Sequence, residues 1–135
     1  MLHWTDLLVD KRKLMAIYGV NFPSLDKVNV HEIIFHRDGP TVTFRVDLLE
    51  YPSSPPKKWI ENEFNTAQIR LSCSDVKYSS LHGWNHTSFV ASIGLNRDGD
   101  LITLALNGDG LSVRIKSSFL DVSSISAYIN TRPIR

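Results

Sequence analysis

Two histidines frame the stretch His31-Glu32-Ile33-Ile34-Phe35-His36, where a metal site would be easiest to build. The zinc-protease motif His-Glu-x-x-His has its second histidine four residues after the first, and Phe35 holds that position here. The motif also needs a helix, whereas the apolar residues of this stretch predict a strand. On a regular strand, residues five apart face opposite sides. We therefore interpret His31 and His36 as strand residues and not as metal ligands.

Two further patterns look like metal sites and lack necessary ligands. His82 and His86 flank a predicted turn and have no third ligand nearby. The Asp98-Gly99 pair resembles the start of a calcium loop, but the glycine position of such a loop falls on Leu101 and its closing acid on Asn107. The sequence therefore predicts no bound metal and no cofactor.

Cys73 is the chain's single cysteine and its most obvious nucleophile. It alternates in register with Ala67, Ile69 and Leu71, which places it on a predicted buried face where a thiol is inert. The sequence contains no glycine-rich phosphate loop, nucleophile elbow or clear carboxylate pair, so we predict no catalytic residues and no enzyme. Because active sites assemble from distant residues, a small ligand-binding or enzymatic α+β domain, with a pocket between helix and sheet, stays open as the alternative.

The bulk composition bounds the class of protein. A chain of 135 residues with a net charge of +1 fits a single domain, 1–135, and lacks the basic excess of a dedicated nucleic-acid binder. One cysteine cannot form an intramolecular disulfide. The first residues do not resemble a signal peptide, and no apolar run reaches membrane-spanning length. We expect a cytoplasmic protein that binds neither nucleic acid nor membrane.

The elements that must position these residues follow from periodicity. Residues 4–18 predict an amphipathic helix that ends at Gly19. Alternating apolar residues predict strands near 28–35, 42–48, 67–73, 76–78, 89–95, 101–106 and 111–116, with turns at 38–39, 81–85, 98–99 and 108–110. Three consecutive apolar residues at 33–35 indicate a bulge or burial on both faces. Residues 50–65 predict a long irregular loop, and 119–129 fit either a strand or a helical turn.

Together these elements predict an α+β fold. The N-terminal helix packs on a mostly antiparallel, meander-rich sheet or sandwich of about seven or eight strands. The inward faces are predicted to carry eight apolar residues: Val42, Phe44, Val46, Ile69, Leu71, Ile93, Leu104 and Val113.

An ordered set of segments resembles one known family. The set comprises Trp4, the stretch from His31 to Pro40, Pro55-Pro56-Lys57-Lys58-Trp59, and Gly83-Trp84. Their order and spacing are similar to those of the immunity protein fifty family of bacterial polymorphic toxin systems. The resemblance implies a small α+β protein, encoded beside a toxin, that protects its cell in contact-dependent competition by binding that toxin.

The resemblance supplies no contact residues, so we predict the toxin-facing surface from charge. Inhibitors of toxins with basic active sites present acids and aromatic residues to them. Segment 47–63 best combines acidic and aromatic residues, and its candidate contacts are Asp47, Glu50, Tyr51, Trp59, Glu61 and Glu63. Alternatively, this segment is a structural loop whose Trp59 covers the sheet edge. The face around Arg45, Arg70 and residues 82–87 is then the next candidate.

Overall fold

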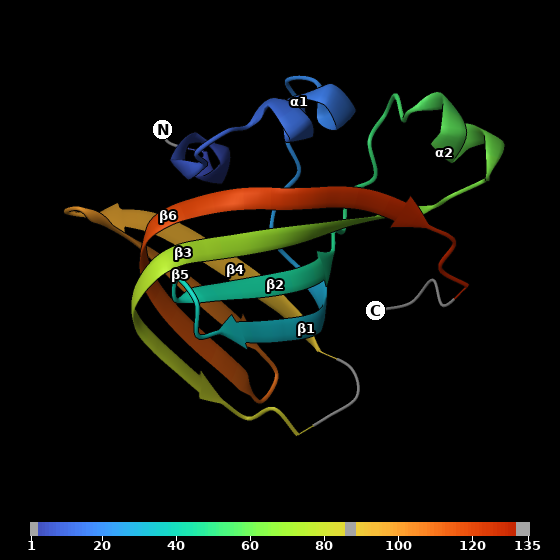
Figure 1. Ribbon diagram of the computed structural model, residues 1–135. Helices are drawn as coiled ribbons and strands as arrows, with labels where there is room; N and C mark the ends of the chain where they lie inside the picture. Colours follow the sequence, from blue (N-terminus) through green and yellow to red (C-terminus); the bar gives the residue numbers. More distant parts are fainter. Residues whose placement is uncertain (1–2, 86–88, 132–135) are drawn as a thin grey trace.

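Six antiparallel strands form a closed barrel in the computed structural model, which describes residues 3–85 and 89–131 (Figure 1). The strands follow the barrel in the order β1-β2-β3-β6-β5-β4. Their bounds are β1 Val28–His36, β2 Thr41–Asp47, β3 Thr66–His82, β4 Val90–Asp98, β5 Leu101–Gly108 and β6 Leu111–Tyr128. The helical elements are η1 Trp4–Leu7, α1 Arg12–Tyr18 and α2 Lys57–Glu61.

The predicted fold class, a helix on seven or eight strands, is therefore wrong. The protein is mainly antiparallel β with short helical pieces, and two of its six strands are unusually long. β3 has 17 residues and β6 has 18, and they pair along nearly their whole length. Irregularities in that pairing, at Arg70/Leu71 and at Val76/Tyr78, interrupt the alternation. Each long strand therefore appears in the sequence as two short elements. The segment predicted at 119–129 is a strand through Tyr128 and forms the second half of β6.

The single helix predicted over 4–18 is also wrong, because the chain leaves helical geometry between η1 and α1. There the backbone N–H of Val9 donates to the carbonyl of Leu120 on β6 at 2.9 Å. α1 restarts where the Asp10 carboxylate accepts the N–H of Arg12, and it buries Leu14 completely. Gly19 ends α1 with a positive φ of 64°, as its position predicted.

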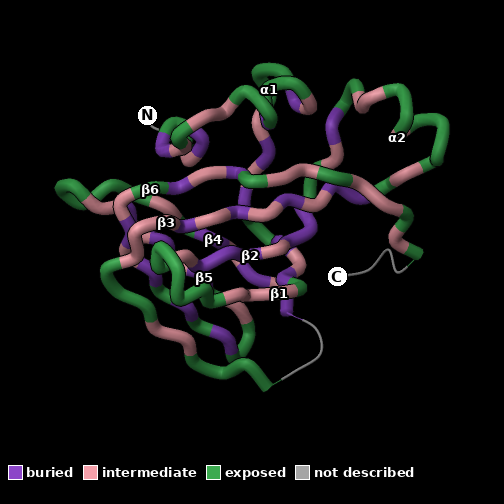
Figure 2. Tube along the Cα trace, in the orientation of Figure 1, coloured by how far each residue is buried: buried purple, intermediate pink, exposed green. Residues whose placement is uncertain are grey.

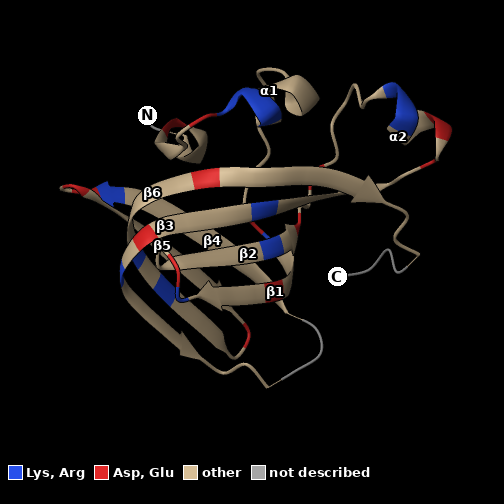
Figure 3. Ribbon diagram, in the orientation of Figure 1, with Lys and Arg blue, Asp and Glu red and all other residues tan. Residues whose placement is uncertain are grey.

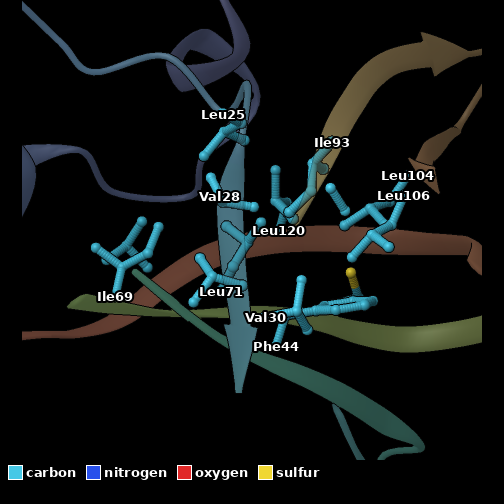
Figure 4. Packing of buried hydrophobic residues seen from close by; sticks show 14 of the residues in the cluster. Leu25, Val28, Val30, Phe44, Ile69, Leu71, Ile93, Leu104, Leu106 and Leu120 are labelled. Atoms are coloured by element: carbon cyan, nitrogen blue, oxygen red, sulfur yellow. The ribbon is translucent and has the colours of Figure 1, made fainter. Parts of the chain in front are cut away.

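The barrel interior holds the core (Figure 2), and the predicted inward residues are all buried in it. Figure 4 shows Phe44, Ile69, Leu71, Ile93 and Leu104 among them. Phe44 and Ile69 are fully buried. Strict alternation along β2 turns Val42, Phe44 and Val46 inward, and this is the period-two pattern that the sequence shows. The predicted turns at 38–39, 98–99 and 108–110 are confirmed as the connections β1–β2, β4–β5 and β5–β6. The turn predicted at 81–85 begins later, because β3 continues through His82.

β1 and β4 pair only where they begin, through Val28–Ala91 and Asn29–Val90. Farther along β4, the N–H of Ile93 donates instead to the carbonyl of Leu25, in the connector that precedes β1. The N-terminal segment thus covers an edge of β4 that would otherwise be open to pairing with another chain. Within the described residues, no helix has the length and apolar character needed to cross a membrane.

Candidate protein-binding surface

Residues 48–65, here called the α2 loop, connect β2 to β3 and project beyond one end of the barrel (Figure 1). The loop was predicted to be irregular and does carry its prolines outside any strand, but it also contains the short helix α2. Pro56 lies at the N-cap of α2, where its missing N–H costs no hydrogen bond.

Two aromatic residues of the predicted surface hold this loop against the barrel. The rings of Tyr51 and Trp59 lie 5.9 Å apart, and both side chains are half-buried against the core cluster. Burial raises the pKa of the Tyr51 hydroxyl, whose oxygen has no hydrogen-bond partner among the described residues. These contacts fix the conformation of the loop and leave part of each ring at the surface.

The three glutamates of the surface differ in how they are engaged. Glu50 joins the loop to the N-terminal segment: its Oε1 accepts the N–H of Ser24 at 2.6 Å, and its carbonyl accepts the hydroxyl of Tyr18 at 2.7 Å. Glu61 and Glu63 are exposed and form no ion pair within the described residues. They are the exposed acidic charges of the α2 loop, which also presents the exposed Lys57 and Lys58.

Asp47 lies at the end of β2 with its side chain fully buried. Its carboxylate accepts hydrogen bonds from Nε2 of Gln68 on β3 at 2.9 Å and from the hydroxyl of Tyr128 on β6. Nε2 of His31 on β1 lies 2.7 Å from it. Asp47 therefore links four strands beside the loop and presents no charge to solvent.

A row of charged residues crosses the outer face of β1, β2 and β3 (Figure 3). The register places Glu32 opposite Arg45 and Arg45 opposite Arg70. Oε1 of Glu32 lies 2.9 Å from Nε of Arg45 and 3.6 Å from an Nη of Arg70. We predicted both arginines as part of a second candidate surface but did not predict Glu32.

The position of the bulge explains why Glu32 was missed. The register of β1 against β2 shifts between Val30 and Glu32, so His31 is the extra residue. His31 and Glu32 both contact side chains on the outer side of β2, the covered Asp47 and the partly exposed Arg45. The apolar run at 33–35 indicated an irregularity but not its position. The alternation argument for His31 and His36 therefore does not apply, because β1 is not a regular strand.

Among the hollows outside the core, two bear on the hypotheses above. One, of about 430 Å³, is at the barrel end beside the α2 loop and is lined by Lys27, Leu48, Leu49, Asn65, Val90 and Asn130, among others. The other, of about 400 Å³, lies between η1 and the barrel, where Leu7, Arg97 and Phe119 contribute to its walls. The second hollow is where the alternative hypothesis expected a pocket between helix and sheet.

In the part of the chain that the structure describes, the candidate metal ligands do not gather into a metal site, and the candidate nucleophile is buried. Within the described residues, no three His, Cys, Asp or Glu side chains are grouped so that they could hold a metal. His86 lies outside the described residues. Cys73 is 1% exposed, and burial raises the pKa of its thiol to about 12. Asp98 and Gly99 belong to the β4–β5 hairpin.

Comparisons with known proteins assign the chain to a family. The family model Immunity protein 50 matches residues 10–128. The chain is similar in structure to an uncharacterized protein from Neisseria gonorrhoeae, with 15% identity, a TM-score of 0.43, and coverage of 73% of this chain and 92% of that one. No curated protein matches the chain. Since the family model covers both the barrel and the α2 loop, the chain belongs to the Immunity protein 50 family.

Proposed function

We propose that this protein binds one cognate toxin of a polymorphic toxin system tightly and neutralises it by covering a surface the toxin needs. The observation that carries the proposal is the match of the immunity-protein family over residues 10–128. The buried thiol of Cys73, whose pKa is raised, and the buried apolar side chains of the barrel interior support a role in binding and not in chemistry.

The α2 loop supplies one suitable contact region. Glu61 and Glu63 offer two exposed negative charges with no ion-pair partner among the described residues, and these can pair with basic groups on a toxin. Tyr51 and Trp59 are already ordered by packing, so less conformational entropy is lost when their exposed edges meet a partner. In this proposal Glu50 and Asp47 act indirectly, because their carboxylates hold the loop and the neighbouring strands in place.

The test is co-expression with the toxin domain encoded beside the gene. Cells that make both proteins in the cytoplasm should survive, whereas cells that make the toxin domain alone should die. The two purified proteins should also elute together in size-exclusion chromatography. Cell death despite abundant folded immunity protein, together with separate elution, would rule the proposal out.

A further inference from the structure

The charged row on the outer face has an unusual composition. Arg45 and Arg70 are direct cross-strand partners on β2 and β3. Their two guanidinium groups share one oxygen of Glu32, at 2.9 and 3.6 Å. Arg70 faces the neutral Ser124 on its other side, so the row has one more positive charge than negative charges.

Like charges placed directly opposite each other destabilise a sheet. A neutral residue at position 70 would keep the ion pair between Glu32 and Arg45 and remove the repulsion. A residue that destabilises the sheet, among neighbours that stabilise it, indicates a functional role. The neighbouring row agrees with the fold, because the hydroxyl groups of Thr43 and Ser72 form a hydrogen bond of 3.1 Å.

The two arginine side chains also differ in exposure and in hydrogen bonding. Arg45 is 26% exposed and is held by Glu32 and by a 3.4 Å hydrogen bond to Gln68. Arg70 is 43% exposed, and its guanidinium donates no hydrogen bond to any described residue. The hydrogen bond from Arg45, followed by the charges of both arginines, lowers the pKa of Glu32, which keeps the row ionised. Figure 1 shows no helix over this face of β2 and β3.

We propose that the Arg45–Arg70 pair receives a carboxylate from an acidic side chain on the toxin. Arg70 would form a two-pronged hydrogen-bonded pair with it, because the planar guanidinium matches a carboxylate. This inference rests on the proposed function and adds a second contact region to it. A protein carboxylate fits better than nucleic acid, which needs several phosphate contacts, because this row has a surplus of only one charge.

The test compares Arg70→Gln with a matched control, Arg114→Gln. Arg114 is also exposed on a strand, but its cross-strand partners are the uncharged Ser80 and Ala105. Titration calorimetry with the toxin domain should show a Kd at least about tenfold higher for Arg70→Gln, with a weaker dependence on salt. The Tm of Arg70→Gln should equal or exceed that of the wild type. Arg114→Gln should leave the Kd unchanged.

Several results would overturn the inference. Wild-type affinity in Arg70→Gln would show that the pair does not contact the toxin. A lower Tm that accompanies the affinity loss would show that Arg70 is structural. If Arg70→Gln abolishes binding of a single-stranded RNA probe, or dissociates a dimer in sedimentation, the pair serves a different partner. Failure of the wild type to bind the toxin would instead remove the proposed function itself.

Discussion

At the scale of single residues, Asp47 changes how the predicted surface is understood. Its charge placed it among the candidate contacts, and its carboxylate is fully buried among groups from three other strands. Sequence spacing could not show this, because His31, Gln68 and Tyr128 are brought together only by strand pairing and a bulge. Glu61 and Glu63, by contrast, are exposed, as surface contacts must be.

Replacing Asp47 should therefore destabilise the fold. Asp47→Ala removes the acceptor of the hydrogen bonds that Gln68 and Tyr128 donate to this carboxylate, and we expect the free energy of unfolding to fall by about 3 kcal/mol. Urea unfolding followed by circular dichroism measures it, with Glu61→Ala as the exposed control. Equal stability of the two variants would show that the buried network does not hold the strands together.

Cys73 gives a prediction on pH. Burial raises the pKa of its thiol from 9.0 to about 12, so the neutral thiol is favoured in the folded state. Its contribution to stability is complete below the unfolded pKa and is lost as the pH rises towards the folded pKa. The folded protein should resist a thiol reagent at mildly alkaline pH and react fully in denaturant. Rapid labelling of the folded protein would contradict this placement.

At the scale of elements, sequence patterning predicted short strands and turns better than long strands. The hairpins at 38–39 and 98–99 have local turn chemistry and are confirmed. β3 and β6 escaped prediction because bends and bulges break the alternation on which strand prediction depends. The helix at 4–18 was overestimated because the hydrogen bond from Val9 to Leu120 is a tertiary interaction that periodicity cannot show.

The α2 loop offers a prediction at this scale. Reversing the two exposed acidic charges, Glu61→Lys with Glu63→Lys, should weaken toxin binding at least about tenfold and leave Tm unchanged, because neither side chain has an ion-pair partner to lose within the described residues. Asp98→Lys, in the β4–β5 hairpin, is the matched control. Full protection of toxin-expressing cells by the double variant would place the interface elsewhere.

At the scale of the whole molecule, the core depends on residues that period-two alternation identified correctly. Phe44 is fully buried and is among the largest side chains in the barrel. Phe44→Ala should lower the free energy of unfolding by about 3–5 kcal/mol through lost burial and an internal cavity. Chemical denaturation measures this, and a change below about 1 kcal/mol would contradict the packed barrel.

The central claim is that protection results from binding and not from catalysis. Purified toxin domain should be titrated with this protein while the toxin's own activity and the intact masses of both proteins are measured. We predict that activity falls linearly to zero at an equimolar ratio and that neither mass changes. Complete inactivation by a small fraction of an equivalent, with a changed toxin mass, would contradict the claim, as would full toxin activity in an excess of this protein.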